Sequence, residues 1–129
     1  KQGFLPDTIS TDIHKNSIML PRAHLNNVMS KFLNIGLSFE QVIERVTVNP
    51  AKAIRRADLG RLDEGGIADI AVLKIEEGEF AFLDSGHGKL TADKNIRCMM
   101  TIRKGGIIWD AEGISMPDWS TAGPYSNFR

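Results

Sequence analysis

A short strand-like segment near the start of the chain constrains its fold more than any other feature. Residues 7–14 are rich in β-branched side chains and follow Pro6, a pattern typical of a short strand. Helical patterns come next, so no partner strand follows directly in the sequence. Because the backbone groups of a strand must be paired, we expect residues 7–14 to pair with strands that this chain does not supply.

Three helices are predicted after this segment. Apolar residues recur at helical spacing from Leu25 to Leu33, and Gly36 follows in the position of a C-terminal glycine cap. Ser38 and Gln41 form a capping-box pattern at the start of a second helix. A third, short helix is predicted at Asn49-Pro50, with the asparagine as N-cap and the proline at the first helical position.

The pattern changes to that of strands at about residue 59. The predicted strands are residues 67–75, 79–83, 98–103 and 107–109. We expect a turn at Glu77-Gly78 and a loop at residues 85–88. Gly105-Gly106 suits a tight hairpin, because glycine adopts positive φ at both central positions.

These patterns divide the chain into three parts. Residues 1–58 form the end of an α/β domain, residues 59–110 form an all-β unit, and residues 111–129 form an irregular tail. The tail is rich in Pro, Gly and Ser, and we expect its aromatic residues to hold it in place, with a partner subunit as one candidate surface. These aromatic residues are Trp119, Tyr125 and Phe128.

Composition narrows the function classes. Sixteen basic residues balance sixteen acidic ones, so the basic surplus typical of partners of nucleic acid or anionic membranes is absent. No apolar run reaches the roughly 20 residues of a membrane span, and no signal peptide opens the sequence. The lone Cys98 excludes an internal disulfide and fits a cytoplasmic location. Since the sequence begins with Lys1, we expect further residues to precede it.

Four segments together resemble the C-terminal part of the amidohydrolase superfamily. They are residues 7–14 (DTISTDIH), 29–36 (MSKFLNIG), 46–53 (VTVNPAKA) and 59–72 (LGRLDEGGIADIAV). The third is similar to the T-x-N-P-A helix start of that family, and the fourth to the G-x-L-x-x-G-x-x-A-D segment that opens its C-terminal β-sandwich. The first two point to the dihydroorotase-like amidohydrolase/deacetylase branch.

The resemblance implies a (β/α)8 TIM barrel with a β-sandwich built from both chain ends. This chain would then be the last strand and helices of the barrel, followed by the C-terminal part of the sandwich, and truncated relative to the family. The family holds one or two divalent metal ions, usually zinc, at the barrel mouth. Of its ligands, only the aspartate that ends the last strand has a counterpart here, Asp12. We therefore expect this chain alone to bind no metal.

Asp12 would be both the metal ligand and the general acid/base. A metal-bound water attacks the scissile carbonyl, and a carboxylate beside it can take the proton and pass it to the leaving nitrogen. Without the resemblance, Asp12 would be interpreted as an aspartate that caps a loop. His14 lies two residues on and would share its strand face, so it is a candidate substrate-binding residue.

Other ionisable side chains have simpler interpretations. His24 is expected in packing or solvent, and His87 at the surface. These residues and Cys98 are scattered, whereas structural zinc sites use closely spaced pairs. The resemblance implies a structural role for Asp69. Residues 14–23 are expected to form one wall of the substrate pocket.

The sequence thus predicts a hydrolase of C–N bonds other than peptide bonds, inactive as the isolated 129-residue chain. Substrates left open are cyclic ureides or imides, N-acetylated amino or hydroxy acids, and an aminated purine. The alternative is a non-catalytic β-rich module that acts only by self-association or with a partner chain. A homo-oligomer is expected in either case, because half a sandwich exposes apolar surface and unpaired edges.

Overall fold

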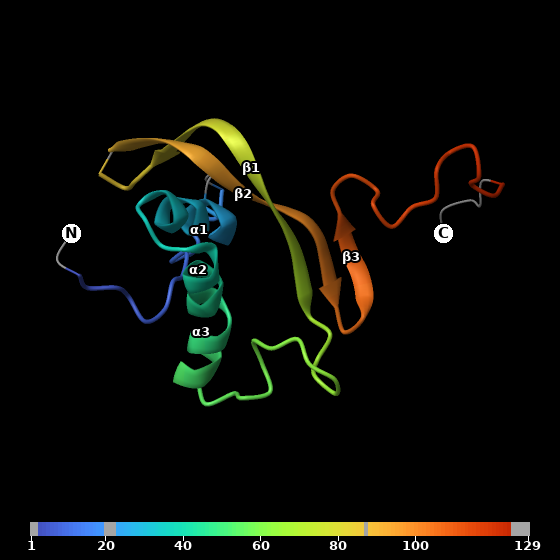
Figure 1. Cartoon of the computed structure of the whole chain (residues 1–129), viewed down its shortest axis with the longest axis horizontal. Helices are drawn as coiled ribbons and strands as arrows, with labels where there is room; N and C mark the ends of the chain where they lie inside the picture. The colour runs from blue at the N-terminus through green and yellow to red at the C-terminus, as the bar shows by residue number, and fades with distance from the viewer. Residues whose placement is uncertain (1–2, 20–22, 87, 125–129) are drawn as a thin grey trace.

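The structure is a computed structural model, and it describes residues 3–19, 23–86 and 88–124. Three helices precede a three-stranded antiparallel sheet of order β1-β2-β3. The elements are α1 (Leu25–Asn34), α2 (Phe39–Val46), α3 (Val48–Ala53), β1 (Ile70–Leu83), β2 (Lys89–Arg103) and β3 (Gly106–Asp110). The long β1–β2 hairpin curves over α1, and β3 extends the sheet at the other end of β2 (Figure 1).

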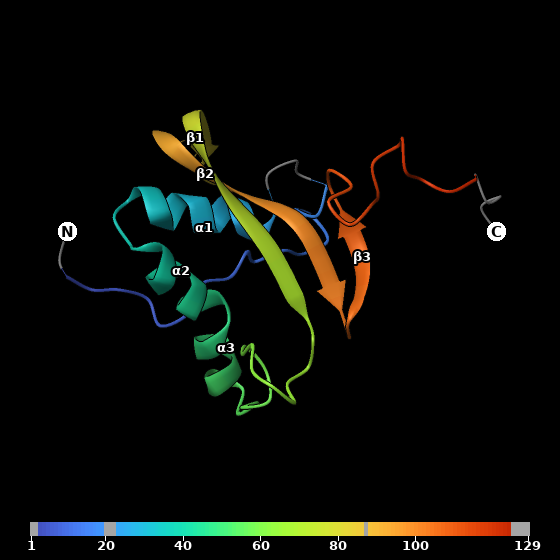
Figure 2. The same cartoon turned by 45° about the vertical axis from the view of Figure 1, so that its right-hand side comes forward.

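The strand predicted over residues 7–14 does not form. This segment is irregular, and no strand among the described residues pairs with it. Instead, the Ile9 N–H donates to the carbonyl oxygen of Arg45 in α2 at 2.9 Å. The segment runs past α2 as the blue trace of Figure 2.

The predicted ends of α1 and α2 are confirmed. After α1, the Gly36 N–H donates to Leu33 O and the Leu37 N–H donates to Phe32 O, the two bonds of a Schellman motif. Gly36 has φ +115°, which favours glycine. At α2, Ser38 and Gln41 form the reciprocal hydrogen bonds of a capping box.

The predicted start of α3 is wrong by two residues. The helix begins at Val48, and Thr47 occupies the N-cap position without a side-chain cap. Asn49 lies inside the first turn, and its side-chain amide donates to Asp7 O instead of capping the helix. Pro50 is still in the first turn, where its missing N–H leaves no helical bond unmade.

The turn predicted at Glu77-Gly78 is also wrong. β1 continues through it, because β2 supplies partners on both sides, Lys94 for Glu77 and Ala92 for Phe80. The irregular pairing between those two positions absorbs the change of register as a bulge. The chain turns later, in the loop predicted at residues 85–88, of which His87 lies outside the described residues.

The second hairpin turn lies one residue earlier than predicted. Lys104 and Gly105 are its central residues, with φ +49° and +80°, and Arg103 pairs with Gly106. Asp69 Oδ1 accepts a hydrogen bond from the Lys104 N–H at 2.8 Å, which supports the left-handed lysine. Asp69 therefore has a structural contact here.

The core joins the helices to the hairpin. Met29 of α1, Leu37, Val42 of α2 and Ile96 of β2 form one buried cluster. This cluster contains residues from both sides of position 58, where the sequence predicts a domain boundary. That boundary stays a prediction. The three-stranded sheet agrees with the all-β character expected of residues 59–110.

The tail contains no helix or strand as far as residue 124. Trp119 does not hold it against this chain, because 88% of that residue is exposed. Tyr125 and Phe128 lie outside the described residues. Among the helices described, none is long and apolar enough to cross a membrane.

Candidate functional site

The backbone that leads to Asp12 is held against α2 and α3. Arg45 Nε donates to Pro6 O at 2.8 Å, and Asn49 Nδ2 donates to Asp7 O at 2.9 Å. The side chain of Ile9 is buried, while Thr8 and Ser10 on either side are exposed. Exposed and buried side chains alternate along residues 8–10, as expected of an extended segment that packs against the protein on one face.

Asp12 itself is exposed and has φ +51°. This left-handed conformation is tolerated by aspartate better than by most residues with a Cβ atom. Asp12 thus has left-handed backbone at the position that the resemblance assigns to the end of the last barrel strand.

His14 lies in a turn and not on a strand face shared with Asp12. Its Nδ1 lies 2.7 Å from Ser17 Oγ, and the Ser17 and Ile18 N–H groups both donate to His14 O. The premise of a common strand face therefore fails. A role of His14 in substrate binding stays a prediction.

His24 has a more definite role than packing or solvent exposure. It is the N-cap of α1, and its Nδ1 accepts a hydrogen bond from the Asn27 N–H at 3.2 Å. A histidine cap is hard to predict from sequence, because Ser, Thr, Asp and Asn are the preferred N-cap residues.

The described residues do not form a metal site by themselves. Among them, no three His, Cys, Asp or Glu side chains lie close enough together to hold an ion. Zinc in proteins takes three or four side-chain ligands, and Asp12 would supply one. The assignment of Asp12 as a metal ligand stays a prediction.

The T-x-N-P-A segment, which begins at Thr47, and the G-x-L segment, which begins at Gly60, contact each other. A Cβ atom on Gly60 would lie 2.7 Å from the carbonyl carbon and oxygen of Thr47. Gly60 also has φ +71°. The T-x-N-P-A and G-x-L segments therefore pack backbone to backbone, and the glycine is needed for both reasons.

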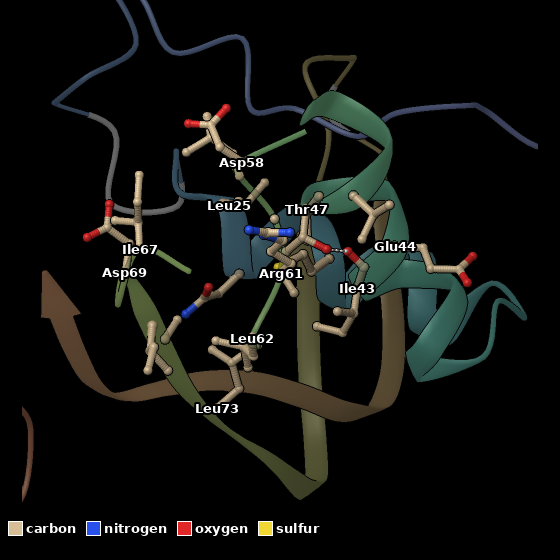
Figure 3. A pocket seen from close by; sticks show the side chains of 18 residues that line it. Leu25, Ile43, Glu44, Thr47, Asp58, Arg61, Leu62, Ile67, Asp69 and Leu73 are labelled. Atoms are coloured by element: carbon tan, nitrogen blue, oxygen red, sulfur yellow. Dashed lines mark hydrogen bonds between the residues drawn. The ribbon is translucent and has the colours of Figure 1, made fainter. Parts of the chain in front are cut away.

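An open pocket of about 550 Å³ lies between the helices, the loop at residues 58–62 and the start of β1 (Figure 3). Its lining is mostly apolar, with Ile43, Leu62 and Leu73 among the residues that Figure 3 labels. Asp12 and His14 do not line it. The pocket is therefore separate from the candidate catalytic residue.

Asp58, which lines this pocket, is no candidate general acid or base at neutral pH. Two hydrogen bonds from Arg56, at 2.8 and 2.6 Å, lower the pKa of its carboxyl group from 3.8 to about 2. It stays ionised throughout the neutral range. Its contact with Arg56 links two residues of the loop that follows α3.

Sequence reasoning missed the contacts of Arg45 and misassigned those of Asn49. Arg45 sits on an ordinary amphipathic helix, and nothing in its spacing signals a bond to a segment 39 residues away. The T-x-N-P-A motif does draw attention to Asn49, but the sequence pattern indicates a helix N-cap at this residue and does not predict its bond to Asp7.

Comparison with known proteins shows which family the chain resembles. Residues 1–106 match the model of the Amidohydrolase family. A deacetylase of Agrobacterium fabrum is 42% identical over 84 residues, which are 65% of this chain and 21% of that protein. The matched part of the chain thus spans about a fifth of the length of this relative.

Two solved structures are similar in both fold and sequence. The crystal structure of an adenine deaminase has a TM-score of 0.73 and 32% identity, covering 81% of this chain and 28% of that one. That of a dihydroorotase has a TM-score of 0.74 and 34% identity, covering 82% and 28%.

Proposed function

The chain belongs to the amidohydrolase family, and from this we propose that it is the C-terminal part of a metal-dependent hydrolase of C–N bonds. The observation that carries the proposal is the family match over residues 1–106, a range that includes Asp12 and its anchored segment. The similar deacetylase, adenine deaminase and dihydroorotase structure agree with hydrolytic chemistry as a class.

The proposed architecture is the end of a TIM barrel followed by part of a β-sandwich. Residues 7–14 would become the last barrel strand once strands from outside this chain lie beside them. The sheet of β1, β2 and β3 would be the C-terminal part of the sandwich. The adenine deaminase and dihydroorotase structures support this architecture, because their similarity in fold covers 81% and 82% of this chain.

Asp12 is the residue we propose for catalysis. In the complete enzyme a divalent metal, one or two zinc ions, would supply an activated water and polarise the scissile carbonyl. Asp12 would bind that metal, take the proton of the water and deliver it to the leaving nitrogen. The remaining ligands would come from barrel strands outside this chain, so the isolated chain is expected to be inactive.

The substrate class to test first is an acetylated compound. The curated relative described above is a deacetylase with 42% identity, higher than that of either solved structure. Cyclic amides would be tested next, as suggested by the similarity to a dihydroorotase, and then an aminated purine, as suggested by the similarity to an adenine deaminase.

A hybrid enzyme tests the proposal. The matching segment of this chain replaces its counterpart in the Agrobacterium fabrum deacetylase, and hydrolysis of the parent enzyme's substrate is measured. We expect activity that a chelator removes and zinc restores. A folded, zinc-loaded hybrid without activity would contradict the proposal.

A second function is favoured by the exposed apolar side chains of β3. Ile107, Ile108 and Trp109 are 48%, 63% and 56% exposed. Such a surface suits a non-catalytic module that works by self-association or with a partner chain. The hybrid enzyme distinguishes the two functions. A folded, zinc-loaded hybrid without activity, together with a purified chain that forms an oligomer of one defined size in light scattering, supports the module, and an active hybrid opposes it.

A further inference from the structure

Two side chains from consecutive helices hold the backbone shortly before Asp12. Arg45 of α2 donates to Pro6 O, and Asn49 of α3 donates to Asp7 O. With the bond from the Ile9 N–H to Arg45 O, three hydrogen bonds fix residues 6–9. The buried Ile9 side chain adds a packing contact at the end of this anchor.

The anchor limits where Asp12 can lie. Asp12 follows Ile9 by three residues, and a chain extends by at most about 3.3–3.6 Å per residue. The Asp12 Cα atom is therefore confined to within about 11 Å of the Ile9 Cα atom. Residues 10–14 are themselves largely exposed, so the anchor is the main constraint on the segment.

Arg45 is itself held in place for this contact. Its Nη1 donates to Gln41 O, one turn earlier in α2, at 2.9 Å. The guanidinium thus bridges a carbonyl of its own helix and the carbonyl of Pro6 with a fixed, planar set of donors. Hydrogen bonds from a charged donor are stronger than those between neutral groups.

We propose that Arg45 and Asn49 are positioning residues for Asp12: they set the place of its segment relative to α2 and α3. The inference rests on the proposed function, because the position of Asp12 matters to catalysis only if Asp12 meets the metal. It assigns the asparagine of the T-x-N-P-A motif to holding the preceding segment and not to capping α3.

Amide hydrogen exchange on the 129-residue chain tests the anchor without any activity. Asn49→Asp keeps the size of the side chain but removes its donor, and Arg45→Met removes the guanidinium. Each should speed exchange of the Ile9 amide about fivefold or more, since one hydrogen bond contributes on that scale. The Ile96 amide, in the core, should not change.

Three further variants serve as controls. Glu44→Gln and Lys52→Gln alter exposed neighbours on α2 and α3 and should leave Ile9 exchange as in the unmodified chain. Asn49→Gln retains a donor and should restore part of the protection lost in Asn49→Asp. Unchanged Ile9 exchange in both Asn49→Asp and Arg45→Met would overturn the inference.

The deacetylase hybrid tests the effect on Asp12. Asn49→Asp should lower kcat about tenfold or more while KM and bound zinc change little, because substrate and metal contacts from the barrel remain. If Asn49→Asp speeds exchange of the Ile9 amide but leaves kcat of the hybrid unchanged, the inference is overturned and the proposed function is not affected. If the unmodified hybrid is inactive, both the proposed function and the positioning role are overturned. The exchange data then still show whether Arg45 and Asn49 hold residues 6–9.

Discussion

The side-chain amide of Asn34 hydrogen-bonds to both backbone groups of Lys94. Its Nδ2 donates to Lys94 O at 2.7 Å, and its Oδ1 accepts from the Lys94 N–H at 3.2 Å. One turn earlier, Ser30 Oγ accepts from the Ile96 N–H at 2.8 Å. Two side chains of α1 thus occupy positions on the edge of β2 that a neighbouring strand would otherwise fill.

Replacing Asn34 by alanine should destabilise the chain. It removes both partners of Lys94, and an unsatisfied, partly buried backbone group costs about 1–3 kcal/mol. Urea unfolding followed by circular dichroism measures the change, with Asn16→Ala at an exposed loop position as control. Equal stability of the two variants would show that the contact contributes nothing.

Gly60→Ala should be more damaging than alanine at another left-handed glycine. Gly65 has a similar φ, +79° against +71°, but a Cβ atom there meets nothing within 4 Å. Left-handed backbone alone costs about 1–3 kcal/mol for a residue with a Cβ atom. The difference between the two variants in thermal unfolding therefore reports the contact with Thr47.

The expected order is Gly60→Ala less stable than Gly65→Ala, and Gly65→Ala less stable than the unmodified chain. Equal losses would mean that the two motif segments do not pack as closely as described.

The Asp58 carboxyl group should titrate near pH 2. Its pKa in the folded chain lies below its usual 3.8, so the Arg56 contact stabilises the fold above that pH and is lost as the pH falls toward about 2. Arg56→Gln should return the midpoint toward 3.8, measured by carbon NMR of the carboxyl group.

Arg61→Gln is the matched control for Asp58, because Arg61 lowers its pKa less than Arg56 does. Both partners of the Arg56–Asp58 pair are about half exposed, so the effect on overall stability should be small. A midpoint near 3.8 in the unmodified chain would contradict the described contact.

The purified 129-residue chain should hold far less than one zinc ion per molecule. The described residues bring no three potential ligands together, and a single carboxylate does not retain zinc. Elemental analysis after gel filtration measures this, and Asp12→Ala should change nothing. Close to one zinc per chain, lost in Asp12→Ala, would show that the chain builds its own site.

Local signals predicted the helices well. The caps at Gly36, Ser38 and Gln41 are set by hydrogen bonds within a few residues, so spacing alone reveals them. Asn49 shows the limit of that reasoning, because it fits a local cap but bonds to Asp7, far away in the sequence.

The strand patterns failed where pairing decides the structure. Residues 7–14 have strand composition but no partner strand in the described part of the chain, and Glu77-Gly78 has turn composition but β2 pairs on both sides of it. Strand formation depends on a neighbour that propensity does not describe. For the candidate site, the family motifs predict a role for Asp12, which stays a prediction. The anchor by Arg45 is a tertiary contact that no spacing indicates.

The most direct test of the account compares the unmodified deacetylase hybrid with its Asp12→Asn variant, measuring kcat and bound zinc on folded protein. If Asp12 is the metal ligand and proton carrier, kcat should fall by about a thousandfold, as for loss of a general acid/base, and zinc should bind more weakly. A variant that keeps both its zinc and its rate would contradict the assignment of Asp12.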